Sequence, residues 1–100
     1  MATKKPIETF QKLLRRELPG LIRRYHVRSL GLFGSYVRHE ERRGSDSDVL
    51  VSFSQTPSLF RYVELENYLS DLLGVKVDLV MQEALKPRIG QRILREVVPV

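Results

Sequence analysis

The stretch "GSDSDVLVSF", residues 44–53, puts two like charges at the start of what reads as a β-strand. In an extended chain Asp46 and Asp48 project from the same face, about 7 Å apart at Cα. At an effective dielectric near 20 their repulsion is on the order of 2 kcal/mol, which is large against the marginal stability of a small domain. We therefore expect a positive partner here. Arg42, Arg43 or water would serve, and so would Mg²⁺, which is bound through one or two carboxylates while phosphates and water complete its octahedron.

Length and composition favour one small soluble domain covering residues 1–100. The chain has 100 residues, 42% of them hydrophobic, and no run approaches the roughly 18 apolar residues of a membrane span. Its first ten residues, "MATKKPIETF", lack the apolar segment of a secretory signal, and the absence of cysteine excludes disulfides and thiolate metal sites. We expect a cytoplasmic protein that does not enter membranes.

The net charge of +5, from 17 Lys and Arg against 12 Asp and Glu, favours an anionic partner: a nucleotide, a nucleic acid or an acidic protein surface. The basic residues are scattered in pairs, such as Arg15-Arg16 and Arg23-Arg24, which on helices are usually solvated. Nucleic-acid binding is the least favoured of the three, because no stacking platform or reading helix is recognisable.

The first third of the chain predicts helices followed by a buried strand. After Pro6, apolar residues recur at helical spacing: Ile7, Phe10, Leu13, Leu14 and Leu18. Pro19-Gly20 predicts a break, and Leu21, Ile22 and Tyr25 predict a short second helix. The apolar segment "VRSLGLF", residues 27–33, predicts a strand that runs into a tight turn.

That turn, Gly34-Ser35, has features of an anion site. We expect "SYVRHEERR", residues 35–43, to form a short helix with Ser35 as N-cap and Arg42 and Arg43 near its end, before Gly44 stops it. Main-chain N–H groups at such a helix start attract phosphate, Gly34 permits close approach, and the Ser35 hydroxyl adds a donor. A Gly-Ser turn by itself is most often only a cap.

The rest of the chain alternates strand and helix. We expect a strand at Ser47–Phe53, a long helix from Thr56-Pro57 to Gly74, a strand at residues 75–81 and a final helix after Pro87. The order α-(α)-β-α-β-α-β-α predicts an α/β domain with a small sheet. The strand at 75–81 carries Asp78, which by itself could equally pair with a buried arginine.

Taken together, these residues resemble a family. "GLFGSYVRHEERRGSDSDVLVSF" looks like the G-S-x-x-R-G-E…S-D-x-D signature of the nucleotidyltransferase superfamily that includes DNA polymerase β, and specifically its minimal nucleotidyltransferases. The resemblance covers about residues 7 to 98. It implies a small mixed β-sheet flanked by helices, the polymerase β-like nucleotidyltransferase fold.

The resemblance also implies roles for particular residues. Gly34 and Ser35 would bind the triphosphate, with Arg38 and Ser45 completing the nucleotide site, and the metal ligands and catalytic carboxylates would be Asp46, Asp48 and Asp78. Arg38 could either steady the phosphates or brace the short helix on the acidic loop. Three carboxylates can hold two Mg²⁺ ions, the arrangement that serves in-line displacement at phosphorus.

One residue departs from the family pattern: His39 stands where the motif has Gly. If that position needs a positive φ, histidine is a less comfortable occupant than glycine. A ligand role for His39 or His26 is not favoured, because a lone exposed histidine is usually only part of the surface.

The function that the resemblance implies is Mg²⁺-dependent transfer of AMP from ATP to a hydroxyl, that of a tyrosine, of a partner HEPN-type RNase toxin, so that the chain acts as its antitoxin. The alternative is a non-catalytic antitoxin that neutralises the toxin by occlusion. The sequence leaves open the nucleotide base, the acceptor residue, the number of nucleotides added and homo-oligomerisation.

Overall fold

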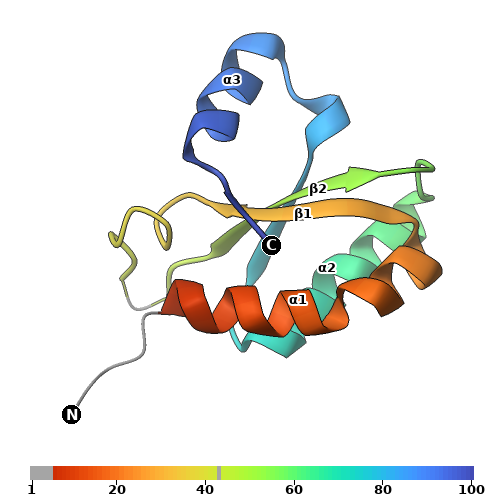
Figure 1. Cartoon of the computed structure of the whole chain (residues 1–100), viewed down its shortest axis with the longest axis horizontal. Coiled ribbons are helices and arrows are strands. Elements are labelled where there is room, and N and C mark those ends of the chain that lie inside the picture. The colour runs from red at the N-terminus through yellow and green to blue at the C-terminus, as the bar shows by residue number, and fades with distance from the viewer. Residues whose placement is uncertain (1–5, 43) are drawn as a thin grey trace.

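The computed structural model describes residues 6–42 and 44–100 (Figure 1). Its elements are α1 (Pro6–Tyr25), β1 (Val27–Phe33), β2 (Ser47–Phe53), α2 (Leu59–Leu73), β3 (Val77–Met81), the 3₁₀ turn η1 (Gln82–Ala84), α3 (Pro87–Glu96) and β4 (Val98–Pro99). No helix within the described ranges is long and apolar enough to cross a membrane.

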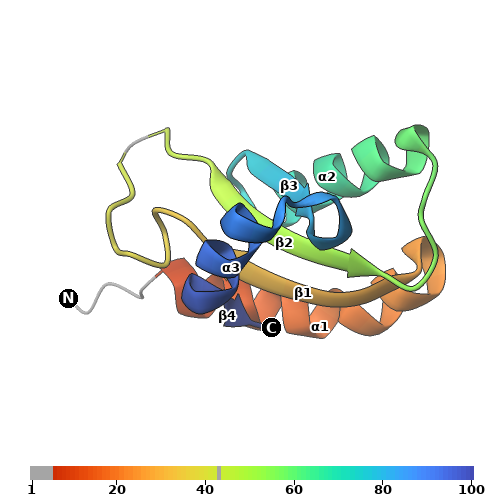
Figure 2. The same ribbon diagram turned by 90° about the horizontal axis from the view of Figure 1, so that it is seen from above.

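The strands form one mixed sheet in the order β3-β2-β1-β4. β1 pairs antiparallel with both β2 and β4, while β2 and β3 run parallel. Figure 2 shows the central strands β1 and β2 side by side, with β3 beyond β2. This is the small mixed sheet flanked by helices that the family resemblance implied.

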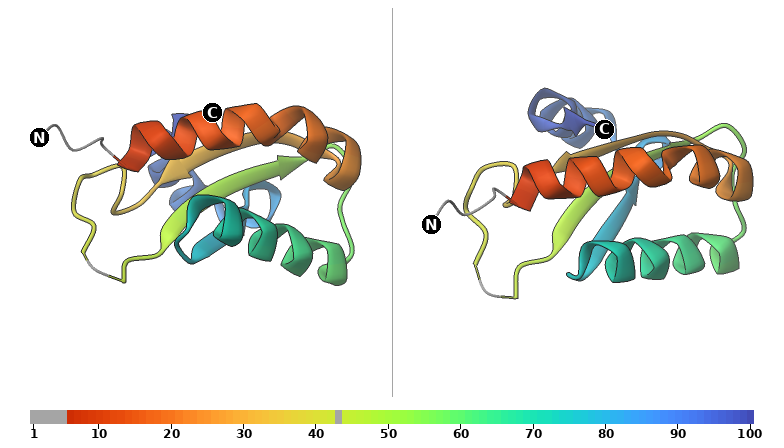
Figure 3. Two further views of the ribbon diagram at one scale, coloured as in Figure 1. Left: turned by 90° about the horizontal axis from the view of Figure 1, so that it is seen from below. Right: turned by 60° about the horizontal axis from the view of Figure 1, so that its bottom comes forward.

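The core lies between the sheet and two helices. α1 and α2 cover one face, and α3 stands on the opposite side (Figure 3). Leucines of both covering helices are fully buried against valines and a leucine of the strands: Leu14, Leu21, Leu65 and Leu69 against Leu32, Val49, Val51 and Val77. Because burial of one such side chain contributes about 1.5–3 kcal/mol, this layer is the main source of stability.

The predicted break at Pro19-Gly20 is wrong. α1 continues through Pro19 to Tyr25 as a single helix, so there is no separate second helix. Proline removes one backbone hydrogen bond from a helix interior, but Leu14, Leu21 and Tyr25 are all buried on one stripe that spans the proline. Tertiary packing of this stripe outweighs the local preference to stop.

The predicted short helix at residues 35–43 is also wrong within the described residues; Arg43 lies outside them. The chain forms consecutive hydrogen-bonded turns over residues 35–39, with the Val37 and Arg38 N–H groups donating to Gly34 C=O, both at 3.1 Å. Beyond the turns Glu40 and Arg42 are exposed. Tyr36 is buried and Val37 is half-buried against the core, but the exposed residues after the turns add no apolar contact that would extend them into a helix.

The remaining elements follow the predictions closely. β1 and β2 have the predicted bounds, and the final helix begins at Pro87. α2 starts at Leu59, slightly later than Thr56-Pro57, because the Ser58 side chain caps it by accepting the Arg61 N–H; it ends before Gly74, whose φ is 73°. β3 starts two residues later than predicted, at Val77, and the sequence analysis missed the two-residue strand β4.

Candidate active site

Two of the predicted carboxylates meet at one end of the sheet. Asp48, near the start of β2, is the register partner of Asp78, near the start of the parallel strand β3. On its other side Asp48 pairs with Phe33, the last residue of β1, so Gly34 follows directly beside it. In β3 the neighbours of Asp78, Val77 and Leu79, are buried while Asp78 is exposed, which places its side chain on the face away from α1 and α2.

The electrostatics show that the three aspartates share one neighbourhood. Burial and the negative charges of Asp78 and Asp46 raise the pKa of Asp48, and only Arg38 works in the opposite direction by a smaller amount. A carboxylate held among like charges is stabilised by any cation that binds there.

The Gly34 turn lies against the Asp48 carboxylate. Gly34 has a φ of 83°, and a Cβ placed on it would lie 1.9 Å from Asp48 Oδ2. Since real Cβ contacts are never this short, only glycine fits between the end of β1 and Asp48. The turn and the first metal-binding candidate are therefore packed together.

Arg38 lies over this turn but contacts no aspartate directly. Its Nε donates to Glu40 Oε1 at 2.7 Å, and its Nη1 donates to Glu96 Oε1 at 2.5 Å. Glu96 also accepts the Gly34 N–H, at 3.2 Å, through Oε2. Of the two roles considered for Arg38, bracing a short helix has no basis, since that helix is not formed.

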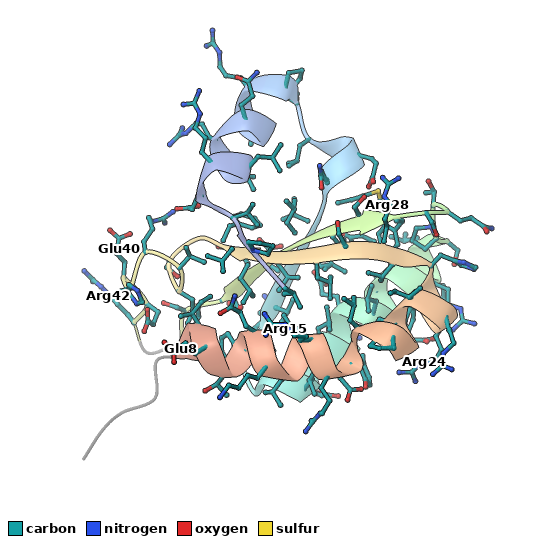
Figure 4. The ribbon with its side chains drawn as sticks, viewed as in Figure 1. Glu8, Arg15, Arg24, Arg28, Glu40 and Arg42 are labelled. Atoms are coloured by element: carbon teal, nitrogen blue, oxygen red, sulfur yellow. The ribbon has the colours of Figure 1, made fainter. Side chains whose placement is uncertain are left out.

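The predicted serines occupy the loop between β1 and β2. Ser45 Oγ accepts the Arg42 N–H at 2.7 Å, and Ser45 C=O accepts the Tyr36 hydroxyl at 3.3 Å, so Ser45 holds the loop in shape. Ser35 is half-buried beside Gly34. Figure 4 shows Glu40 and Arg42 projecting from this loop, at the opposite end of the molecule from Arg28.

A cleft of about 330 Å³ opens between the sheet end and α3. It is lined by residues of the turn, the sheet and the last helix: Phe33, Gly34, Arg38, Asp48, Ile89, Arg92, Ile93 and Glu96. A larger hollow between α2, β3 and η1 has only uncharged lining residues, so it lacks the groups that the chemistry requires.

The α3 residues were not predicted as part of the site. In the sequence, Arg92 and Glu96 look like ordinary solvent-facing charges of an amphipathic helix. No pattern signals that this helix folds back over the Gly34 turn, because its position depends on the pairing of β4 with β1 at Gly31 and Leu32.

The donor set suits Mg²⁺, which takes hard oxygen ligands and keeps several waters and phosphate oxygens. Asp48 and Asp78 offer such oxygens in register, and the raised pKa of Asp48 marks a place that favours a cation. Within residues 6–42 and 44–100, no three acidic or histidine side chains already form a complete metal cage. The fit is therefore to an ion held jointly by carboxylates and substrate.

His39 adopts the backbone conformation that the family pattern suggests for its glycine. Its φ is 57°, and its side chain is exposed. The substitution therefore adds strain of order 1 kcal/mol in the turn without placing a side chain over Asp48. His26, also exposed, has a φ of 58° at the end of α1.

Comparisons with known proteins show the family of the chain. Residues 10–100 match the family described as nucleotidyltransferase domain. A Thermococcus cleftensis protein named protein adenylyltransferase MntA is 48% identical over 92 residues, covering 92% of this chain and 93% of that protein. A solved structure described as a "putative minimal nucleotidyltransferase" has a TM-score of 0.77 at 36% identity, covering 94% of this chain and 95% of that one. A toxin-antitoxin structure with AMP-PNP has a TM-score of 0.69 at 27% identity, covering 92% of this chain and 69% of that one.

Proposed function

The chain belongs to the nucleotidyltransferase domain family and is a minimal nucleotidyltransferase, and from this premise we propose that it transfers AMP from ATP, with Mg²⁺, to a protein hydroxyl of a partner toxin. The observation that carries the proposal is the register pairing of Asp48 with Asp78 beside the Gly34 turn. It brings two acidic groups and the Gly34 turn, where we propose that phosphate binds, to one end of the sheet.

The relatives support the type of reaction and the type of partner. One relative is named a protein adenylyltransferase, and one structural neighbour is a toxin-antitoxin complex with an ATP analogue. We propose that the partner is a HEPN-type toxin, that its acceptor is a tyrosine, and that modification makes this chain its antitoxin.

The proposed chemistry is an in-line displacement. The Gly34 N–H, Ser35 and Arg38 hold the triphosphate, with Ser45 keeping the loop in place. The acceptor oxygen attacks the α-phosphorus and forms a new P–O bond, while the bond to the β-phosphate oxygen breaks and pyrophosphate leaves. The Asp78 carboxylate takes the acceptor's proton.

Asp46, Asp48 and Asp78 would hold the Mg²⁺ ions. When bound, such ions neutralise charge on the attacking and leaving oxygens. Burial and the acidic neighbours of Asp48 disfavour its ionised form. A bound cation would reverse this effect and stabilise the ionised carboxylate.

A second function, neutralisation by occlusion without catalysis, is favoured by exposed apolar side chains on α2. Leu59 is 78% and Phe60 83% exposed, and Val63 lies one turn further along the helix. Exposed apolar patches commonly mark protein interfaces. The two functions can coexist, because modification requires docking.

One experiment separates them. The protein is incubated with Mg²⁺, ATP labelled in its α-phosphate and the proposed partner toxin. Label on the toxin that disappears with Asp46→Asn and with Asp48→Asn, while the matched control Asp71→Asn on the exposed side of α2 keeps it, supports catalysis. Neutralisation by both site variants without label supports occlusion. Mass spectrometry of the labelled toxin then identifies the acceptor, and a residue other than tyrosine contradicts that part of the proposal.

A further inference from the structure

The Glu96 carboxylate fills a place built to hold an anion. One of its oxygens accepts the Gly34 N–H at 3.2 Å, and the other accepts Arg38 Nη1 at 2.5 Å. A main-chain amide at a glycine turn and a guanidinium are the groups with which proteins bind phosphate oxygens. Both groups that would hold a phosphate are therefore bound to a side chain of the protein itself.

A second arginine reinforces this place. Arg92 lines the same cleft as Gly34 and Arg38. Burial by itself would raise the pKa of Glu96, but the hydrogen bonds from Arg38 and the Gly34 N–H, with the charges of Arg38 and Arg92, lower it overall. Glu96 is thus ionised at neutral pH. It is stabilised by the Gly34 N–H and by the positive charges of Arg38 and Arg92.

The element that carries Glu96 is loosely held. α3 has no buried residue among its ten, all of which the structure describes, and it stands apart from the sheet on the side opposite α1 and α2 (Figure 3). Glu96 is its last residue, and its side chain is 24% exposed. The carboxylate can therefore leave the turn by a rotamer change or a small shift of α3, without loss of core packing.

We propose that Glu96 is an internal substitute for a phosphate group, so that a polyphosphate binds only by displacing it from the Gly34 N–H and Arg38. This rests on the proposed function in one respect, the assignment of the Gly34 turn to the triphosphate. Once Glu96 is displaced, the Gly34 N–H and the Arg38 Nη1 that it occupied become available to the incoming phosphates, with Arg92 lining the same cleft. Glu96 is a positioning residue that sets how tightly the nucleotide binds.

The expected size of the effect follows from population arithmetic. When only a fraction of molecules is competent to bind, the apparent affinity falls by that fraction, so a contact formed in about nine molecules of ten weakens binding about tenfold. The opposite role, in which Glu96 orients Arg38 for the phosphates, predicts that its removal weakens binding. The direction of the change decides between the two roles.

The test measures binding of inorganic triphosphate by calorimetry to the wild type, Glu96→Gln and Glu40→Gln. Glu40 is the matched control, because it forms the other ion pair with Arg38 at 2.7 Å but makes no bond to Gly34. We expect Glu96→Gln to tighten binding roughly three- to tenfold and Glu40→Gln to change it by less than about twofold. Thermal melting confirms that each variant is folded, and Glu96→Ala serves if the amide of glutamine keeps the bond to Arg38.

Weaker or unchanged triphosphate binding by both Glu96 variants overturns the proposal, as does the absence of any triphosphate binding to the wild type and to both Glu96 variants. A tightening of equal size in Glu40→Gln also overturns it, because the cause would then be net charge. Label transfer from ATP, measured on the same variants, keeps the proposals separate. If the Glu96 variants bind triphosphate more tightly but no AMP is transferred, only the proposed function is contradicted. If AMP is transferred but the Glu96 variants do not bind triphosphate more tightly, only the role of Glu96 is contradicted.

Discussion

Asp48 and Asp78 lie opposite each other in register on the parallel strands β2 and β3. Neighbouring strands are about 4.8 Å apart, so two carboxylates on the same face stand close together at the sheet's end. Asp48 is also pressed against Gly34. The site therefore concentrates negative charge that lowers the stability of the folded chain. Such a cluster is expected where the carboxylates bind a cation.

The first prediction is that Asp48→Asn makes the metal-free protein more stable while abolishing nucleotidyl transfer. The gain should be on the order of 2 kcal/mol, the scale of repulsion between unit charges about 7 Å apart at an effective dielectric near 20. Chemical denaturation at neutral pH, with a chelator present and Asp71→Asn as control, measures it. A variant less stable than the wild type would contradict this reading of Asp48.

The same substitution should have a pH signature. Because the pKa of Asp48 is raised in the folded state, its protonated form contributes stability that is fully present below the unfolded-state pKa and is lost as pH rises through the folded-state pKa. The stability advantage of Asp48→Asn should therefore be largest near neutral pH and shrink on acidification. An advantage that grows as pH falls would show that the sign is wrong.

A second prediction concerns the close approach of Gly34 to Asp48. Gly34→Ala introduces both backbone strain at φ 83° and a clash with the Asp48 carboxylate, whereas Gly44→Ala introduces the strain alone, at φ 86° with no described atom within 4 Å of the new Cβ. We expect Gly44→Ala to cost about 1 kcal/mol and Gly34→Ala at least twice as much, with loss of nucleotide binding. If chemical denaturation shows equal losses of stability for the two variants, Gly34 does not lie in close contact with the Asp48 carboxylate.

The third prediction concerns His39. At φ 57°, glycine is favoured over any residue with a Cβ, so His39→Gly should exceed His39→Ala in stability by about 1 kcal/mol, although glycine is the more flexible residue when unfolded. Alanine controls for loss of the imidazole. If alanine is the more stable, the positive φ is not maintained in solution.

The strands were easier to predict from the sequence than the path of the first helix. Asp48 and Asp78 meet because the strands that carry them pair in register. The strands at 27–33 and 47–53 were predictable because they are short apolar runs bounded by turn residues. The path of α1 through Pro19 was not, because burial of Leu21 and Tyr25 against the rest of the fold overrides a local break.

The contribution of α3 was beyond sequence reasoning for a different reason. Glu96 reaches the Gly34 turn across 62 residues of chain, through a helix with no buried residue. Periodicity identifies such a helix but says nothing about which surface it covers. The two-residue strand β4 that fixes its end is too short to leave a pattern, and one of its residues is Pro99.

A fourth prediction concerns ligand-linked stability. A ligand that binds only the folded state stabilises it by about 2.7 kcal/mol at 100 times its dissociation constant. A non-hydrolysable ATP analogue should therefore raise the melting temperature of the wild type with Mg²⁺ present, and a chelator should remove most of that increase. Asp48→Asn should show little dependence on Mg²⁺, and an unchanged Mg²⁺ response in this variant would place the ion elsewhere.

The most direct test of the central claim asks which phosphate of ATP reaches the partner toxin. Parallel reactions with Mg²⁺ contain ATP labelled in either the α- or the γ-phosphate. Transfer of AMP predicts that the α-label appears on the toxin and the γ-label in pyrophosphate. Label from the γ-position on the toxin, or none from either position while Asp48 is intact, would contradict the assignment of this site to nucleotidyl transfer.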